Sequence, residues 1–400
     1  MFYQIMTYDI LNQNNKFTRL IMLLYISGSF PENQEGIAAC AKVTLDSFVK
    51  NMEADRIILL TTDTPIITDK IAVNCPVKYD LMPNWHINRY NIRKLYKILH
   101  DNNIKVIHMD YPGDLYGKTF LASFIPYIVH RYNRRYGTDI KINVRLHEFS
   151  RSRFLRKVAI MPILFCANSI YVPAKKDRDI VSKFAGRRVH PTFIGSNITV
   201  IDDDIKPDPD KITISYFGSV YPGKGIEHML DIWKKIKQQD TDNRFIFRII
   251  GDIGTESNNH FADYHKQVWK WITQYGLKDS IEVTGYLSDE DVSREIKKSN
   301  MATLFYEDGL TLRRGSFLAY LSHGIPVITS AGDEEATELF SNHPGVAMTM
   351  SDVEIINKIE EYNSLSASKR LQIQHDNVSL SQHFNWDKIA RGYLKDYGLI

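Results

Sequence analysis

Short apolar runs alternate with helix-like segments along the first half of the chain. The apolar runs have the length of buried strands and cover residues 20–27, 56–61, 106–109, 142–146 and 169–172. Apolar residues at three- and four-residue spacing predict helices between them, at 39–50, 87–99, 120–132 and 151–165. Strands that alternate with helices in this way predict a parallel sheet with helices on both faces.

The second half repeats this pattern after a linker. Predicted strands at 213–217, 245–250 and 281–284 alternate with predicted helices at 228–238, 264–275 and 289–298. Residues 195–210 form the linker, because their aspartates and prolines disfavour both helix and strand. We therefore expect an α/β protein of two doubly wound domains, residues 1–200 and 206–379. A C-terminal helix at 381–400 is expected to pack back onto the first domain.

Residues 302–330 contain the clearest candidate for a binding site. An apolar run at 302–305 predicts a buried strand, and a helix is predicted over 311–323. The turn between them carries two acids and a glycine. This turn lies at the carboxyl end of its strand, where open α/β sheets bind their ligands.

The residues around this turn suit an anion. A helix that opens after Gly309 would offer unpaired N–H groups and the positive end of its dipole to a phosphate. Arg313 and Arg314 add full positive charges. The alternative is an ordinary strand, turn and helix with a solvated basic pair.

Charge is divided unevenly between the two halves. Residues 1–200 contain 28 Lys and Arg against 16 Asp and Glu, whereas residues 201–400 contain 22 against 31. The basic half is expected to face an anionic partner. Aromatic residues interleave with the basic residues of segment 131–157, which suits an anionic membrane surface. A solvated basic face is the alternative, and no nucleic-acid-binding signature accompanies it.

Cysteine usage and hydropathy favour the cytoplasm. Cys40, Cys75 and Cys166 are far apart in the sequence, which fits a reducing compartment and no metal site. The amino terminus lacks the pattern of a signal peptide, and the longest apolar stretch is too short to span a bilayer. Any contact with the inner face of the plasma membrane is expected to be peripheral.

Three further motifs carry candidate chemistry. Residues 218–225 resemble a phosphate-binding loop, but Gly225 stands where that loop needs Ser or Thr for Mg²⁺; Lys224 could still reach a diphosphate. His147 ends a predicted strand, although a lone histidine is more often structural. The acids at 202–204 suggest either a metal site or, as we expect, a solvated linker.

Four motifs occur in one order and at domain-scale spacing in the second half. They are FGSVYPGKGIE at 217–227, IIGD at 249–252, VTGYLSDEDV at 283–292 and EDGLTLRRGSFLAYLSHGIPVI at 307–328. Together they resemble the nucleotide-sugar domain of a retaining glycosyltransferase of the GT-B fold, similar to glycosyltransferase family 4. In the first half, GSFPENQEGI at 28–37 and RLHE at 145–148 resemble that family's glycine loop and catalytic-site histidine segment. The resemblance implies two Rossmann-like domains that face each other across a cleft.

The resemblance also implies roles for individual residues. Lys224 would neutralise the donor diphosphate, Asp308 would bind sugar hydroxyls and His147 would face the transferred sugar, which makes these three the predicted catalytic residues. Gly309 would hold the β-phosphate, and Gly36 would let the first domain approach the sugar closely. The other predicted substrate-binding residues are Glu148, Gly218, Ser219, Gly251, Tyr286, Glu307, Leu310, Thr311, Arg313, Arg314 and Ser316.

The chain departs from the family pattern at two positions. Ser219 stands where the family commonly has an arginine, so Arg313 or Arg314 is expected to supply the second cation. The family often has two glutamates eight positions apart, the second of which binds the ribose. Eight positions after Asp308 this chain has Ser316, and eight positions after Glu307 it has Gly315. Either Glu307 or Asp308 is therefore expected to meet the sugar, and no glutamate is expected to hold the ribose.

The predicted function is retaining transfer of a hexose from a nucleoside-diphosphate sugar to a glycan or lipid-linked acceptor, in cell-surface polysaccharide or glycolipid synthesis. The scheme needs no metal, because Lys224 and an arginine would neutralise the diphosphate. It needs no cofactor, because the nucleotide-sugar is itself a substrate. Two alternatives stay open: a nucleotide-sugar epimerase of the same fold, and a non-catalytic module that binds nucleotide-sugar or lipid.

Overall fold

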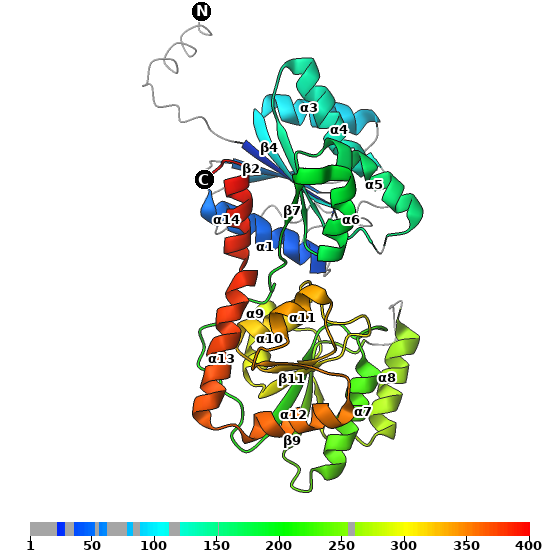
Figure 1. Cartoon of the computed structure of the whole chain (residues 1–400), viewed down its shortest axis with the longest axis vertical. Coiled ribbons are helices and arrows are strands. Elements are labelled where there is room, and N and C mark those ends of the chain that lie inside the picture. The colour runs from blue at the N-terminus through cyan, green and yellow to red at the C-terminus, as the bar shows by residue number, and fades with distance from the viewer. Residues whose placement is uncertain are drawn as a thin grey trace, which may run out of the picture. The chain divides into compact units, whose positions relative to one another are not determined.

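The computed structural model describes residues 22–28, 36–52, 56–61, 78–82, 89–111, 121–150, 152–254 and 261–400. The chain forms two compact units, each with a central sheet and helices on both sides of it (Figure 1). Unit 1 consists of Met1–Val172, Asp179–His190 and Ala390–Ile400, and unit 2 of Pro173–Arg178 and Pro191–Ile389. The expected α/β fold with two doubly wound parallel sheets is confirmed.

The sheet of unit 1 has seven strands. In pairing order they are β3 (Lys78–Met82), β2 (Arg56–Thr61), β1 (Met22–Ser27), β4 (Ile104–Tyr111), β5 (Lys141–Leu146), β6 (Ser169–Val172) and β7 (Val189–Pro191). From β3 to β6 every neighbouring pair is parallel. The strand order reverses between β1 and β4, which makes this the switch point of the sheet.

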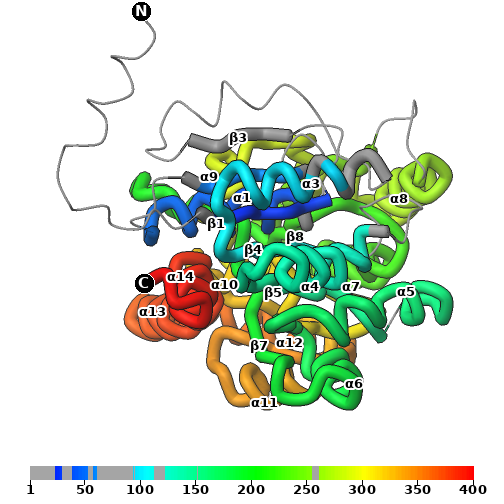
Figure 2. The backbone as a smooth tube through the Cα atoms, turned by 90° about the horizontal axis from the view of Figure 1, so that it is seen from above, coloured from blue at the N-terminus to red at the C-terminus, as the bar shows by residue number. Residues whose placement is uncertain are grey.

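Helices cover the two faces of this sheet (Figure 1). They are α1 (Gly36–Asn51), α3 (Arg89–Asp101), α4 (Ile125–Tyr136), α5 (Phe154–Cys166) and α6 (Lys175–Ala185), with short 3₁₀ turns at Leu121–Phe124 (η1) and Gly186–Arg188 (η2). Helices α4 and α5 lie side by side and contact each other (Figure 2).

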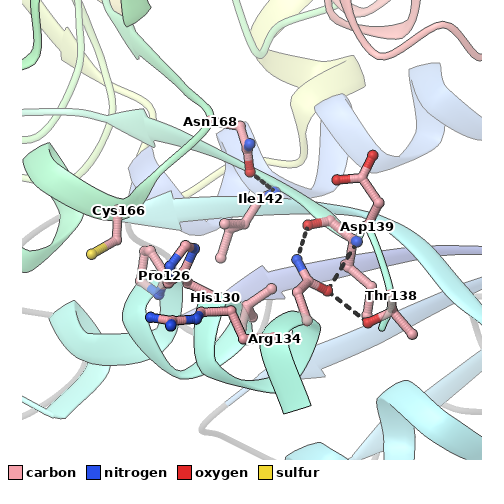
Figure 3. A pocket seen from close by; sticks show the side chains of 11 residues that line it. Pro126, His130, Arg134, Thr138, Asp139, Ile142, Cys166 and Asn168 are labelled. Carbon is pink, nitrogen blue, oxygen red and sulfur yellow. Dashed lines mark hydrogen bonds between the residues drawn. The ribbon is translucent and has the colours of Figure 1, made fainter. Parts of the chain in front are cut away.

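Asn133 fixes the turn that joins α4 to β5. Its side-chain oxygen accepts hydrogen bonds from the Thr138 hydroxyl and the Ile140 N–H, and its amide donates to the Ile140 carbonyl (Figure 3). Gly137 ends α4 at φ +63°, in the left-handed region that favours glycine. These hydrogen bonds therefore fix the path of the backbone from α4 into β5.

The sheet of unit 2 has six strands, all paired in parallel. In pairing order they are β10 (Ile281–Val283), β9 (Phe245–Ile250), β8 (Ile212–Phe217), β11 (Met301–Leu304), β12 (Val327–Thr329) and β13 (Val346–Met348). The order reverses between β8 and β11, so the loops after these strands border the switch point.

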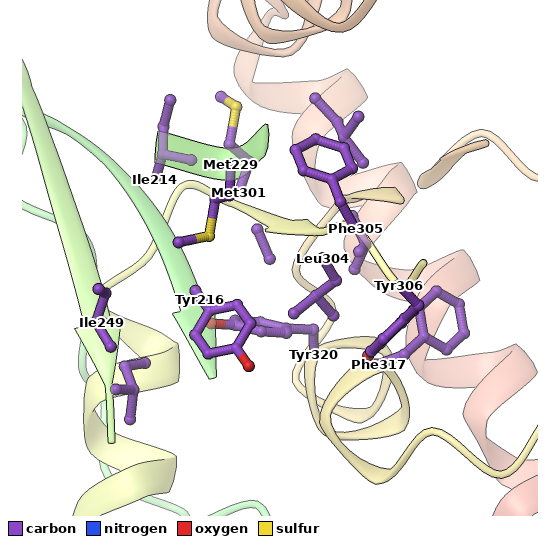
Figure 4. Packing of buried hydrophobic residues seen from close by; sticks show 14 of the residues in the cluster. Ile214, Tyr216, Met229, Ile249, Met301, Leu304, Phe305, Tyr306, Phe317 and Tyr320 are labelled. Carbon is purple, nitrogen blue, oxygen red and sulfur yellow. The ribbon is translucent and has the colours of Figure 1, made fainter. Parts of the chain in front are cut away.

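The helices of unit 2 complete its two outer layers. They are α7 (Ile226–Gln239), α8 (Ala262–Gln274), α9 (Asp289–Lys297), α10 (Gly315–Ser322), α11 (Glu334–Phe340), α12 (Asp352–Ser364) and α13 (Ala367–Ser381). Side chains from β8, β11 and α10 pack together in the core, among them Tyr216, Leu304 and Phe317 (Figure 4). Trp233 of α7 stacks on Phe247 of β9 with a centroid distance of 5.0 Å.

The C-terminal segment contributes to both units. After a 3₁₀ turn at Gln382–Phe384 (η3), helix α14 (Trp386–Asp396) begins in unit 2, where Trp386 packs against Gly195. From Ala390 onward its residues belong to unit 1. There the Tyr397 hydroxyl lies 2.6 Å from Nδ1 of His108. No helix within the described ranges is long and apolar enough to cross a membrane.

We predict that unit 2 loses stability in mild acid because of His323. Nδ1 of this ring lies 2.7 Å from the Ala319 carbonyl, and Nε2 lies 2.7 Å from the Ser293 hydroxyl. Burial lowers the His323 pKa from 6.5 to about 4. The folded state therefore binds this proton less readily than the unfolded state, so the stabilisation is complete above pH 6.5 and is lost as the pH falls towards about 4.

Urea unfolding checks this prediction. Between about pH 7.5 and pH 5 the wild type should lose about 2 kcal/mol more stability than the variant His323→Gln. An equal loss in both proteins would show that His323 does not carry the pH dependence.

Candidate functional site

The candidate site of unit 2 lies where two loops leave the carboxyl ends of β8 and β11. Residues 218–225 follow β8, and residues 305–314 follow β11. Because both strands are parallel neighbours at the switch point, the two loops meet at one edge of the sheet. The Glu307 N–H donates to the Gly223 carbonyl across 3.2 Å and so joins one loop to the other.

Gly225 permits the close approach of these loops. It precedes α7 at φ +64°, and a Cβ atom built on it would lie 1.7 Å from the Phe305 carbonyl oxygen. Any side chain would therefore push the two backbones apart. The same residue that excludes a Mg²⁺-binding phosphate loop thus brings Lys224 next to the loop after β11.

Two cations lie within cation–π distance of one aromatic ring at this edge. Nζ of Lys224 lies 5.6 Å from the ring centroid of Tyr306 and 4.9 Å from that of Tyr221, and Cζ of Arg314 lies 4.4 Å from the Tyr306 centroid. These are cation–π distances, so the buried Tyr306 ring orients both side chains. The Tyr306 hydroxyl lies 2.7 Å from the Ser316 hydroxyl, and burial raises the pKa of Tyr306 to about 12, which keeps it neutral.

The positive charge at this site is only partly neutralised. Arg314 forms an ion pair with Asp308. Within the described ranges no carboxylate forms an ion pair with Lys224, which is half-buried. A half-buried lysine without a carboxylate partner attracts an anion, and a diphosphate carries enough charge to pair with more than one cation.

Four other predicted donor-side residues lie around these loops. Gly218 follows β8 at φ +138°, and its N–H donates to the Ile250 carbonyl across 3.2 Å. The Ser219 carbonyl accepts from the Tyr216 hydroxyl at 3.0 Å. Gly251 follows β9, and a Cβ atom added to it would lie 2.7 Å from the Gly218 carbonyl oxygen. Tyr286 lies after β10 and is 72% exposed.

The predicted helix at 311–323 is wrong at its start. Helix α10 begins at Gly315, and residues 309–314 form turns before it. The Leu310 N–H donates to the Ala331 carbonyl, and the Arg314 N–H donates to the Thr311 carbonyl. The residues directly after Gly309 are therefore not a helix N-terminus, and the first unpaired helical N–H groups belong to the turn that starts at Gly315.

Several predicted residues of this segment have structural surroundings. Leu310 is fully buried, and both of its backbone groups are hydrogen-bonded to residues 331 and 333, so it cannot offer a side chain to a ligand. Thr311 is buried, and its hydroxyl accepts from the Arg313 N–H at 3.4 Å. Glu307 is exposed on the loop, and Arg313 is half-buried.

Two of the three acids at 202–204 form surface ion pairs. Asp203 lies 3.2 Å from Arg294, and Asp204 lies 3.1 Å from Lys206. No group of three or more His, Cys, Asp or Glu side chains in the described part of the chain is placed to hold a metal ion.

Unit 1 holds a buried polar cluster around His147. Nε of Arg145 lies 2.5 Å from Oδ1 of Asp110, and its NH2 nitrogen lies 2.8 Å from Oδ2, so the pair is bidentate. The His147 ring places Nε2 3.3 Å from the same Oδ1. Tyr25 donates its hydroxyl proton to Asp110, and Arg145 donates to the Thr44 hydroxyl at 2.9 Å. Strands β1, β4 and β5 thus meet at the Asp110 carboxylate, and helix α1 joins them through Arg145.

Asp110 is ionised in this cluster and orients His147. Burial alone would raise the pKa of its carboxyl, but Arg145 and the hydrogen bonds with His108 and His147 hold that pKa well below its usual range. Asp110 is absent from the predicted site residues because the predicted strand stopped at 109. An acid at the end of an otherwise apolar strand was the available signal.

The remaining first-domain predictions are only partly described. Gly36 is the first residue of α1, while residues 29–35 of the predicted glycine loop lie outside the described ranges. Glu148 follows His147 and is half-buried.

Comparison with known proteins agrees with this geometry. Residues 197–370 match the family described as Glycosyl transferases group 1, and this range contains all of the candidate site in unit 2. The chain has no match among curated protein sequences. The matched range lies within unit 2.

Solved structures similar to the whole chain share its fold at low sequence identity. A glycosyltransferase from Rickettsia africae ESF-5 has a TM-score of 0.72 at 14% identity, and the match covers 95% of this chain and 98% of that one. HepE from Anabaena, in complex with UDP and glucose, has a TM-score of 0.67 at 13% identity, with 95% and 100% covered. The lipopolysaccharide outer core galactosyltransferase WaaB has a TM-score of 0.62 at 12% identity, with 94% and 99% covered. The domain match and the shared fold support a GT-B glycosyltransferase.

We predict that Lys224→Ala lowers turnover with a working donor by about 10²–10³, the usual cost of losing one charge-stabilising group in a shielded site. Lys234→Ala is the matched control, because Lys234 lies on α7, the helix that follows the Lys224 loop, where its Nζ is 4.7 Å from the ring centroid of Tyr275. The rate of nucleotide release measures both variants. A decrease in turnover of less than about threefold in Lys224→Ala, or an equal decrease in the control, would show that Lys224 does not stabilise the leaving group.

Proposed function

We propose that this protein transfers a hexose from a nucleoside-diphosphate sugar, with retention, to a glycan or lipid-linked acceptor. The observation that carries the proposal is the meeting of Lys224 and Arg314 on the Tyr306 ring, inside the region that matches glycosyl transferases group 1. The similarity to HepE, whose structure contains UDP and glucose, supports the same kind of donor. The motif order further suggests glycosyltransferase family 4.

In the proposed reaction, the acceptor oxygen bonds to the anomeric carbon while the bond from that carbon to the β-phosphate oxygen breaks. The acceptor proton passes to the leaving phosphate on the same face of the sugar. Lys224 and Arg314 stabilise the charge that grows on that phosphate, as preorganised cations do in a shielded site. Asp308 would exchange its ion pair with Arg314 for a sugar hydroxyl, and His147, oriented by Asp110, would face the transferred sugar.

The proposal requires neither a metal nor a cofactor. In metal-dependent transfer a divalent ion neutralises the diphosphate, and here two side-chain cations would take that role. The acids at 202–204 are assigned to the linker, since two of them pair with neighbouring basic residues.

We further propose that the acceptor belongs to cell-surface polysaccharide or glycolipid synthesis at the inner face of the plasma membrane. The basic first half of the chain supports an anionic surface as its partner. The likeness in fold to WaaB, a lipopolysaccharide galactosyltransferase, agrees with a lipid-linked acceptor.

Proton NMR of the released sugar tests retention and metal independence together. With UDP-glucose or another accepted donor and no acceptor, slow hydrolysis in the presence of EDTA should release first the anomer present in the donor. The triple change of Asp202, Asp203 and Asp204 to Asn should leave the rate within a few fold.

The opposite anomer would contradict retention. Strict dependence on a divalent ion, together with loss of donor binding in the triple variant, would contradict the site assignment. Donor binding without any nucleotide release would favour a non-catalytic module, and conversion of the donor to an isomeric sugar would favour an epimerase.

A further inference from the structure

Helix α5 exposes a stripe of large apolar side chains. Leu155 is 71% exposed, Val158 53% and Phe165 60%, and these positions recur on one face at helical spacing. Phe154, at the start of the helix, is 77% exposed. The opposite side of the helix buries Ile160, Ile163 and Leu164 against the sheet. Contiguous apolar side chains on a surface mark an interaction site more often than chance exposure does.

Helix α4 beside it adds aromatic and basic side chains. Tyr127 is 43% exposed, and Phe124 in the preceding 3₁₀ turn is 41% exposed. Arg131 and Arg134 are exposed on α4, and no carboxylate in the described part of the chain forms an ion pair with either of them. Neither α4 nor α5 contains an Asp or Glu. This surface is therefore apolar and cationic at once.

A pocket of about 310 Å³ opens between these helices and the amino ends of β5 and β6. Arg134 supplies a cationic group, Pro126 and Ile142 supply apolar walls, and Cys166 lies at the end of α5 (Figure 3). Asp139 also lines the pocket, and its carboxylate lies 2.7 Å from Nζ of Lys141. Its volume lies in the range of small-ligand pockets. An arginine in a pocket beside exposed apolar side chains suits a phosphate that is attached to a lipid.

We propose that the α4–α5 face, defined by Tyr127, Arg131, Arg134, Phe154, Leu155 and Phe165, docks on an anionic lipid bilayer, with a lipid phosphate entering the pocket at Arg134. The inference extends the membrane part of the proposed function, and it is tested without donor or acceptor, so either can fail alone. A bilayer interface accepts apolar side chains and attracts cations at the same time.

A second copy of the chain fits this face less well. A symmetric contact would bring the same surface of both copies together and place cations opposite cations, which is unfavourable. Anionic headgroups instead supply the negative charge that α4 and α5 lack.

Sedimentation with vesicles tests the proposal. The protein should bind phosphatidylcholine vesicles that contain about 30% phosphatidylglycerol, should bind pure phosphatidylcholine far less, and should be released by salt. Leu155→Ser should weaken binding by about fivefold or more. Leu371→Ser is its matched control, because Leu371 is 65% exposed on α13 of unit 2 and should be silent.

Two single-arginine variants test whether a lipid phosphate enters the pocket. Arg134→Ala and Arg153→Ala each remove one exposed cation, but only Arg134 lines the pocket. Loss of one surface charge should weaken vesicle binding about fivefold, and this is the expected effect of Arg153→Ala. Arg134→Ala should weaken vesicle binding more than fivefold, because it also removes the contact with the lipid phosphate. Equal losses of binding in the two variants would contradict entry of a lipid headgroup into the pocket. Thermal melting at the wild-type temperature confirms that each variant folds.

Three results would overturn the docking face. One is equal binding to neutral and anionic vesicles, and another is an effect of Leu371→Ser as large as that of Leu155→Ser. The third is a dimer in analytical ultracentrifugation that Leu155→Ser dissociates while vesicle binding is absent, which would assign the face to a second copy.

Discussion

The candidate donor site depends on backbone packed directly against backbone at the carboxyl edge of the second sheet. Gly225 lies against the Phe305 carbonyl and Gly251 against Gly218, while a Cβ atom added to Gly309 would lie 2.7 Å from the Ala331 carbonyl oxygen. Each of the three glycines has a positive φ in a position that leaves no room for a side chain. These contacts bring the loops after β8, β9 and β11 together, and the positions of Lys224 and Arg314 follow from them.

The two units treat buried charge in opposite ways. In unit 1, Arg145 and Asp110 are fully buried and form an ion pair, so the pair joins strands β4 and β5 and orients His147. In unit 2, Lys224 and Arg314 share the Tyr306 ring, and only Arg314 has a carboxylate partner in the described residues. The first arrangement pairs its charges within the fold, and the second leaves the charge of Lys224 without a carboxylate partner in the described residues.

The fold was largely predictable from the sequence, because buried parallel strands give unbroken apolar runs and their helices give three- and four-residue spacing. Strands such as β9 and β6 match the predicted ranges. The start of α10 was not predictable, since residues 311–314 have helix-compatible side chains and the hydrogen bonds of Leu310 with Ala331 and Asp333 hold the preceding backbone out of the helix. Asp110 and Tyr306 were missed because their roles arise from neighbours distant in the sequence.

A crystal structure with UDP or an accepted nucleotide-sugar bound tests the central claim most directly. The account predicts the diphosphate at the carboxyl ends of β8 and β11, with Nζ of Lys224 and the Arg314 guanidinium within about 3.5 Å of phosphate oxygens, directly or through one water. A diphosphate bound elsewhere in unit 2, or one that leaves both cations well beyond that reach, would contradict it.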